Sequence, residues 1–125
     1  MMIIIGLAGS GKTSYYHKKL LNDYELYDDF ISNPFDIEEI NDRMCLIDPR
    51  LCDFKIFQDI MSDIEKYIDK TKINLILFEN NPEKCLINSK NRLNKNVENM
   101  INIYSKKYKL TNYYNYNYEI VKVFE

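Results

Sequence analysis

The chain has 125 residues, a length that suits one domain and leaves too little sequence for a second. Its hydrophobic share of 46% and charged share of 29% fit a globular chain, and no apolar run approaches the roughly 20 residues of a membrane span. The net charge of −2 argues against a general nucleic-acid coat, and three cysteines without a CxxC pair indicate neither a disulfide framework nor a zinc site. We therefore expect a single cytoplasmic domain over residues 1–125, with no membrane segment.

A phosphate-binding pattern follows the first apolar run. Residues 2–5 are expected to form a buried strand, and residues 6–13 read Gly-Leu-Ala-Gly-Ser-Gly-Lys-Thr, which matches G-x-x-x-x-G-K-[ST] at every fixed position. A helix expected over 13–22 completes the strand–loop–helix context. The glycines let backbone N–H groups form a concave nest for polyphosphate oxygens, Lys12 adds a charge at the β- and γ-phosphates, and Thr13 offers a hydroxyl to magnesium. The predicted nucleotide-binding residues are Gly9, Ser10, Gly11, Lys12, Thr13 and Ser14.

Two adjacent carboxylates stand at the end of the next predicted strand. Residues 24–30 are expected to form this strand, with Asp28 and Asp29 near its end, and an Asn-Pro pair then opens a helix predicted over 34–43. In a parallel sheet the carboxyl ends of the strands face the ligand crevice, so either acid could lie near the phosphates of the loop. A solvated turn explains the same two residues equally well.

The third and fourth predicted strands also end in acids. Residues 44–48 form an apolar run closed by Asp48, the shape of the second P-loop signature, in which a carboxylate at a strand end holds magnesium directly or through water. A helix is predicted over 49–70 from apolar residues that recur every three or four positions. Residues 74–78 form the fourth strand, which Glu79 closes before a further Asn-Pro helix start.

Residues 83–96 are basic and lose their apolar residues towards the end. Lys84, Lys90, Arg92 and Lys95 supply the charge, which fits either a solvated helix face or a lid over a phosphoryl-transfer site. A lid needs cations that close over the transferred group and exclude water, and the planar guanidinium of an arginine matches phosphate oxygens better than a lysine does.

The chain ends with a helix predicted over 97–108 and a strand predicted over 119–124. The Tyr/Asn run between them, residues 113–118, has no helical period, and is either loop and strand edge or a stacking surface for bases. Five strands joined by crossover helices predict an α/β fold, a three-layer α/β/α arrangement around a five-stranded parallel sheet. The motifs placed on this fold resemble those of the P-loop NTPases, and the resemblance implies the nucleotide-kinase-like class.

Taken together, the motifs resemble the P-loop kinases, and within them the small kinase domain of phage-type polynucleotide 5′-hydroxyl kinases. Residues 9–13 look like the phosphate loop of that family, residues 27–29 its acidic end of strand two, and residues 46–48 its end of strand three. Residues 85–92 resemble its lid segment, in which an arginine follows an Asn-Ser-Lys run.

The resemblance implies an enzyme that moves the γ-phosphoryl group of ATP to a hydroxyl with the help of Mg²⁺. It implies that Lys12 and Thr13 bind the nucleotide and the metal, that Asp29 takes the proton of the attacking hydroxyl, and that Arg92 stabilises the transferred group. Asp48 would then support the magnesium or the acceptor side. The implied acceptor is the 5′ end of a nucleic acid.

One departure from the family pattern concerns the acceptor. The family places an arginine just after the acidic pair, where this chain has Phe30, Ile31 and Ser32, and this weakens the case for a nucleic-acid 5′ end. A small-molecule kinase and a nucleotide-binding protein without turnover remain alternatives, whereas a GTP switch is disfavoured because the Asn-Lys-x-Asp guanine motif is missing.

The sequence leaves several further points open. They are the preference between ATP and GTP, the oligomeric state, and which of four acids serves as base or metal ligand. Those four acids are Asp28, Asp29, Asp48 and Glu79.

Overall fold

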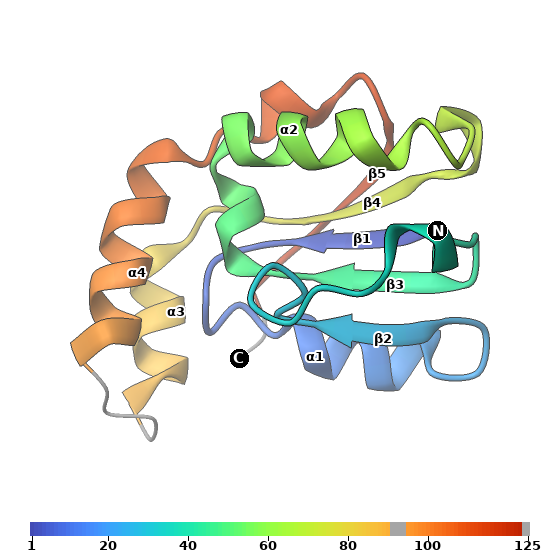
Figure 1. Cartoon of the computed structure of the whole chain (residues 1–125). Helices are drawn as coiled ribbons and strands as arrows, with labels where there is room; N and C mark the ends of the chain where they lie inside the picture. The colour runs from blue at the N-terminus through green and yellow to red at the C-terminus, as the bar shows by residue number, and fades with distance from the viewer. Residues whose placement is uncertain (91–94, 124–125) are drawn as a thin grey trace.

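A five-stranded sheet forms the centre of the protein, whose computed structural model describes residues 1–90 and 95–123. Its strands are β1 (Met2–Ile5), β2 (Glu25–Asp28), β3 (Met44–Ile47), β4 (Asn74–Phe78) and β5 (Asn117–Val121). Every neighbouring pair is parallel and the order across the sheet is β2-β3-β1-β4-β5, so the carboxyl ends of all five strands meet at one edge (Figure 1). The predicted α/β class and the five-stranded parallel sheet are confirmed.

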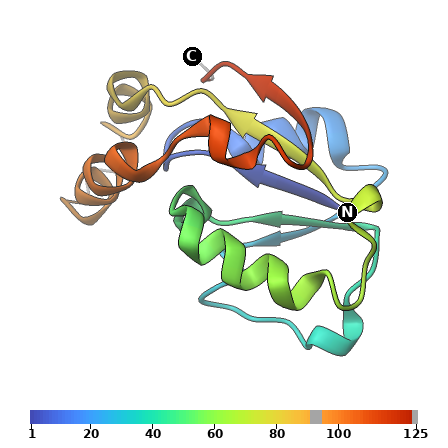
Figure 2. The same cartoon turned by 90° about the horizontal axis from the view of Figure 1, so that it is seen from above.

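Helices cover both faces of this sheet (Figure 2). On one face, α1 (Lys12–Tyr15) continues as one π-helical turn, η1 (Tyr16–Leu20), and packs Tyr16 and Leu20 against alternate residues of the strands. The strand residues in this cluster include Ile4, Cys45, Ile47, Ile76 and Phe78. Because side chains alternate along a strand, the intervening residues face the other side of the sheet.

The second face carries the larger core. Helix α2 (Phe54–Ile64) buries Phe57, Met61 and Ile64 there, at helical spacing along one side. The strand residues on this face include Ile3, Ile5, Met44, Leu46, Leu75 and Leu77. The apolar runs that the sequence marks as buried strands are therefore buried on both sides, as in other parallel sheets.

Two helices stand beyond the carboxyl ends of the strands, α3 (Pro82–Asn88) and α4 (Lys95–Lys107) (Figure 1). The predicted start of α3 is confirmed, because Asn81 Oδ1 accepts a hydrogen bond of 3.1 Å from Lys84 N. After α4, the buried Tyr108 donates a 2.6 Å hydrogen bond from its hydroxyl to the carbonyl of Phe78. The strand end before α3 is thereby tied to the segment after α4.

The turn η6 (Leu110–Tyr113) then leads into β5. In the described residues, no helix combines the length and apolarity that crossing a membrane requires.

The predicted helix over 34–43 is wrong. The segment contains only the 3₁₀ turn η2 (Ile37–Glu39), and the amide of Asn33 donates to the carbonyl of Asp29 instead of capping a helix. Phe35 and Ile40 pack onto the core from an irregular backbone, so apolar burial is achieved without a helix.

The predicted helix over 49–70 is interrupted. It begins as the 3₁₀ turn η3 (Pro49–Cys52), restarts at α2 and ends there at Ile64. The cause is Asp53, whose extended backbone and side-chain bond to Lys55 N start a new helix. The 3₁₀ turn η4 (Lys70–Lys72) precedes β4.

Candidate functional site

The loop between β1 and α1 curls through two left-handed glycines. Gly9 has φ of 81° and Gly11 has φ of 101°, a region that side-chain-bearing residues rarely adopt. A Cβ atom added to Gly9 would stand 2.5 Å from both the Cys85 carbonyl oxygen and the Ser89 hydroxyl oxygen of the α3 region. Glycine is therefore required there both by conformation and by the close approach of α3.

Lys12 is buried beneath this loop. Its ammonium group donates to the carbonyl oxygens of Gly6 at 2.9 Å and Leu7 at 2.8 Å. Burial lowers its pKa, because the charged form loses hydration, while the nearby acids and thiols act in the opposite direction. Among the described residues, the direct hydrogen-bond partners of the Lys12 ammonium group are thus backbone carbonyls of the loop.

A cavity of about 400 Å³ opens in front of the loop. It lies at the carboxyl edge of the sheet, where ligands bind in open parallel sheets. It is lined by Ala8, Gly9, Gly11, Lys12, Thr13, Ser14, Asp28, Ile47, Pro49 and Asn88. Five of the six predicted nucleotide-binding residues line it, whereas Ser10 is fully buried and does not.

Asp28 ends β2 and lines the same cavity. Thr13 Oγ1 donates a hydrogen bond of 3.3 Å to Asp28 Oδ2. This bond joins the first turn of α1, which follows β1, to the end of β2, which is separated from β1 in the sheet by β3. In the described part of the chain, no hydrogen bond uses the other carboxylate oxygen, Oδ1. Asp28 is therefore the acid that faces the glycine-rich loop.

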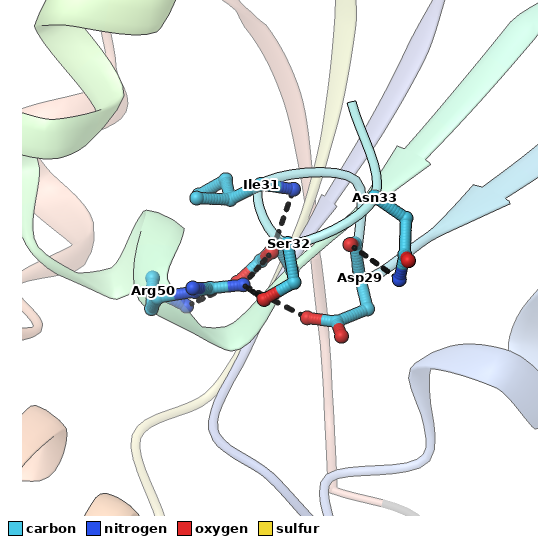
Figure 3. Close-up of polar contacts among 6 residues, drawn as sticks. Asp29, Ile31, Ser32, Asn33 and Arg50 are labelled. Atoms are coloured by element: carbon cyan, nitrogen blue, oxygen red, sulfur yellow. Dashed lines mark hydrogen bonds and ion pairs between the residues drawn. The ribbon is translucent and has the colours of Figure 1, made fainter. Parts of the chain in front are cut away.

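Asp29 takes a different direction from its neighbour. Its φ is 52°, so the chain turns left-handed at this residue, and its Oδ1 accepts a 2.9 Å hydrogen bond from Arg50 Nη2 (Figure 3). Asp29 does not line the cavity in front of the loop. The residue predicted as base thus lies in an ion pair at the side of the cavity.

Asp48, predicted as a magnesium ligand, is fully buried and saturated with hydrogen bonds. Oδ1 accepts from the backbone N and Nε of Arg50, and Oδ2 accepts from Ile31 N and Arg50 Nη2, at distances between 2.9 and 3.2 Å. The bonds to Asp48 are the main reason that the pKa of Arg50 is raised. Both oxygens are thus engaged by N–H donors, which leaves Asp48 poorly suited to a metal.

The predicted lid over 83–96 is described in part. Its helix α3 lies against the glycine-rich loop, where Asn88 Nδ2 donates to the Gly9 carbonyl at 3.0 Å. Arg92, predicted to stabilise the transferred group, lies outside the described residues. Glu79 is engaged away from the cavity, because its Oε1 accepts from Val123 N.

A second cavity of about 380 Å³ adjoins the first at Gly11. Tyr15 and Phe78 form an aromatic wall with ring centroids 6.0 Å apart in an edge-to-face arrangement. Its other lining residues come from η1, from β5 and from the residue after β5: Lys18, Lys19, Glu119, Ile120, Val121 and Lys122.

Two residues of this region were not assigned a role from the sequence. Asn88 lines the cavity from α3, and Arg50 joins the end of β3 to the turn after β2, two segments that are far apart in the chain. The position of Arg50 two residues after a strand-end acid was a usable signal, because an Asp in that place commonly caps the turn that follows. Its contacts with the segment after β2 depend on β2 and β3 lying side by side.

Comparison with known proteins gives one relative that spans the whole chain. It is a protein of Acanthamoeba polyphaga mimivirus described as "Uncharacterized protein R277", 37% identical over 134 aligned positions that cover 100% of this chain and 97% of the relative. No family model and no solved structure matches the chain. The chain belongs to one family with this mimivirus protein.

Proposed function

We propose that the protein is an ATP-dependent phosphotransferase of the P-loop kinase type, which moves a γ-phosphoryl group to a hydroxyl acceptor. The observation that carries the proposal is the juxtaposition of Lys12, Thr13 and Asp28 around one cavity at the carboxyl edge of the sheet. The glycine-rich loop supplies the donor site, and Asp28 supplies a carboxylate on the side from which an acceptor enters.

The loop binds the polyphosphate of the donor. Its two left-handed glycines turn backbone N–H groups into a concave surface, and nests of this kind bind phosphate oxygens. Lys12 adds a buried charge that exchanges the carbonyl oxygens of Gly6 and Leu7 for phosphate oxygens when the donor binds. The phosphate charge then favours the protonated ammonium, which burial alone disfavours.

The residues around Thr13 fit a magnesium ion. Because the Thr13 hydroxyl is the donor in its hydrogen bond to Asp28, the lone pairs of its oxygen are available to a cation. No group of three or more His, Cys, Asp or Glu within the described ranges could hold a metal alone, which suits Mg²⁺, an ion that takes few protein ligands beside phosphate oxygens and water. When bound, magnesium neutralises the charge that develops on the phosphates.

We assign the role of base to Asp28 in place of Asp29. A general base must lie within hydrogen-bond reach of the acceptor hydroxyl, and Asp28 lines the cavity with an oxygen free of protein hydrogen bonds among the described residues. Asp29 is paired with Arg50 at the side of the cavity. Asp48 then serves the structure of the acceptor side instead of the metal.

The second cavity suits the nucleoside end of the donor. It adjoins the phosphate loop at Gly11, and the rings of Tyr15 and Phe78 offer apolar surface to a base. For the acceptor, the resemblance of the motifs to polynucleotide 5′-hydroxyl kinases favours the 5′ end of a nucleic acid. A nucleoside, nucleotide or other small hydroxyl compound is the alternative.

The test is transfer of labelled γ-phosphate from ATP with Mg²⁺ to a panel of acceptors. The panel contains 5′-hydroxyl DNA, 5′-hydroxyl RNA, nucleosides and nucleoside monophosphates. We expect label on the 5′-hydroxyl oligonucleotides, and label on the small molecules alone would support the alternative acceptor class. ATP binding without transfer to any of the four would contradict the proposed function.

Two lysine variants control this experiment. Lys12→Ala removes the buried charge and is expected to lower transfer by at least about 10²-fold, the usual cost of losing one charge-stabilising donor. Lys66→Ala removes an exposed lysine whose ion pair, within residues 1–90 and 95–123, is with Asp63 on its own segment, and is expected to leave transfer unchanged.

A further inference from the structure

The backbone at Asp29 is held in the left-handed conformation, which few non-glycine residues adopt, although Asp and Asn adopt it more often than other side-chain-bearing residues. Asp29 is the one non-glycine residue with positive φ in the described ranges, at 52°. Such a conformation costs free energy and persists only where surrounding contacts fix it. The contacts that hold Asp29 in this conformation therefore indicate the role of the turn that begins there.

Backbone contacts close the turn that follows Asp29. The Asp29 N–H donates to the Ile47 carbonyl at 2.8 Å, which extends the pairing of β2 with β3 by one residue. The Asp29 carbonyl then accepts from Ser32 N at 3.1 Å and Asn33 N at 3.0 Å. These bonds close a turn, but none of them restrains the side chain of Asp29.

Arg50 supplies that restraint. Its Nη2 atom donates to Asp29 Oδ1 at 2.9 Å and to Ser32 Oγ at 2.8 Å, so one guanidinium nitrogen joins both ends of the turn (Figure 3). Arg50 is in turn fixed by Asp48, to which it donates from Nε at 3.0 Å and from Nη2 at 2.9 Å. Paired bonds of this kind set the plane as well as the position of a guanidinium.

The arrangement has a buried end and an exposed end. Asp48 has a side chain exposed to 0%, whereas the side chains of Arg50 and Asp29 are exposed to 28% and 54%. Asp48 also accepts from Ile31 N, so the same buried carboxylate fixes the arginine and the turn that the arginine reaches. The position of Asp29 is therefore determined from the core outward.

We propose that Arg50, anchored by Asp48, is a positioning residue that keeps the two adjacent acids apart. By holding Asp29 left-handed and to the side, Arg50 leaves Asp28 as the carboxylate that bonds Thr13 and faces the cavity. Without Arg50, the backbone of Asp29 relaxes towards an extended conformation. The carboxylates of Asp28 and Asp29 then compete for the cations that bind at the cavity. The catalytic consequence rests on the proposed function, whereas the conformational one does not.

The experiment compares Arg50→Lys with Arg43→Lys, a matched change at an exposed arginine. The backbone ¹³C chemical shifts of Asp28 and Asp29 in the labelled full chain report their conformation, with phosphoryl transfer and ATP affinity measured beside them. We expect the Asp29 shifts of Arg50→Lys to move towards extended values and transfer to fall by about 10- to 100-fold, with ATP affinity within about twofold. Arg43→Lys should match the wild type in all three.

A rescue separates positioning from direct contact with substrate. Adding Asp29→Gly to Arg50→Lys supplies a residue that adopts positive φ without strain, and should restore part of the lost transfer. Loss of transfer without rescue would mean that Arg50 acts on the substrate itself, which overturns the proposal. Unchanged Asp29 shifts in Arg50→Lys would overturn it as well, and so would altered shifts with full transfer.

Two further outcomes keep the test decisive. If Arg50→Lys does not fold, Asp29→Gly and Asp29→Ala replace it, because both lack the carboxylate and only glycine suits the left-handed backbone. Equal transfer by these two variants would overturn the proposal. If the wild type transfers no phosphate but the Asp29 shifts move in Arg50→Lys or differ between the two Asp29 variants, the proposed function fails while the conformational role of Arg50 stands.

Discussion

In the proposed function the cavity has a donor side and an acceptor side, and different parts of the chain form them. The donor side is one continuous stretch, residues 6–13, whose shape comes from backbone conformation, and all three glycines of the chain lie in it. The proposed acceptor side is assembled from the end of β2, the end of β3 and the turns that follow them, joined by the side chains of Asp29, Asp48 and Arg50. The shape of the donor side therefore depends on backbone conformations that glycine adopts because it has no side chain. The shape of the acceptor side depends on hydrogen bonds of individual polar side chains.

On the donor side, one substitution should weaken both nucleotide binding and the stability of the protein. Gly9→Ala places a Cβ atom 2.5 Å from the Cys85 carbonyl and forces a positive φ of 81° on a residue that avoids it. We expect nucleotide affinity to fall by about 10²-fold or more, together with a loss of about 1–3 kcal/mol in unfolding free energy. Calorimetric titration with ATP and urea unfolding measure the two effects, and wild-type affinity would show that backbone shape does not define the donor side.

The two adjacent acids should respond unequally to the same substitution. Asp28→Asn removes the carboxylate that faces the cavity and is expected to lower transfer by about 10²- to 10⁴-fold. Asp29→Asn keeps an oxygen for Arg50 and a residue type that tolerates left-handed backbone, so transfer should stay within a few-fold of the wild type. Steady-state transfer rates decide, and the reverse ranking would return the role of base to Asp29.

Two buried thiols beside the loop should lower the unfolding free energy of the protein at alkaline pH. Burial raises the pKa of Cys52 to about 12 and that of Cys85 to about 11, each from 9.0. The unfolded chain therefore loses these protons first, and stability falls as pH rises above 9, by up to about 1.4 kcal/mol per pH unit for each thiol. Urea unfolding from pH 8 to pH 10 should show a smaller decline in Cys52→Ala than in the wild type, and equal slopes would contradict this.

A smaller effect is expected where the strand ends are tied together. Tyr108→Phe leaves the carbonyl of Phe78 without its 2.6 Å hydrogen bond in a buried place, which should cost about 1–3 kcal/mol of unfolding free energy. Tyr67→Phe, at a side chain exposed to 54%, serves as the control and should be neutral. Equal stability of both variants would show that the hydroxyl of Tyr108 contributes nothing to the edge that carries the site.

The same contrast explains how much of the molecule could be predicted from its sequence. The glycine-rich loop is local, so eight consecutive residues with an apolar run before them were enough to predict a curled loop between a strand and a helix. The buried strands were predictable for a similar reason, because runs such as 44–48 are apolar on both faces. The Asn81 cap is a local feature as well.

The acceptor side depends on contacts between segments far apart in the chain. A dipeptide of acids at a strand end does not say which one faces the ligand, and here the choice follows from the left-handed backbone of Asp29 and its bond to Arg50. That arginine lies 21 residues away along the chain and is adjacent only because β2 pairs with β3. The predicted helix over 34–43 failed similarly, because the Asn33 amide bonds the turn instead of starting a helix.

Titration of ATP with Mg²⁺ into the wild type and Lys12→Ala tests the central claim most directly, because Lys12 is buried at the base of the loop and contacts only loop carbonyls among the described residues. The account predicts saturable binding to the wild type that weakens by about 10²-fold or more in Lys12→Ala, with both proteins folded. Equal affinity of the two proteins, or no binding by the wild type, would contradict it.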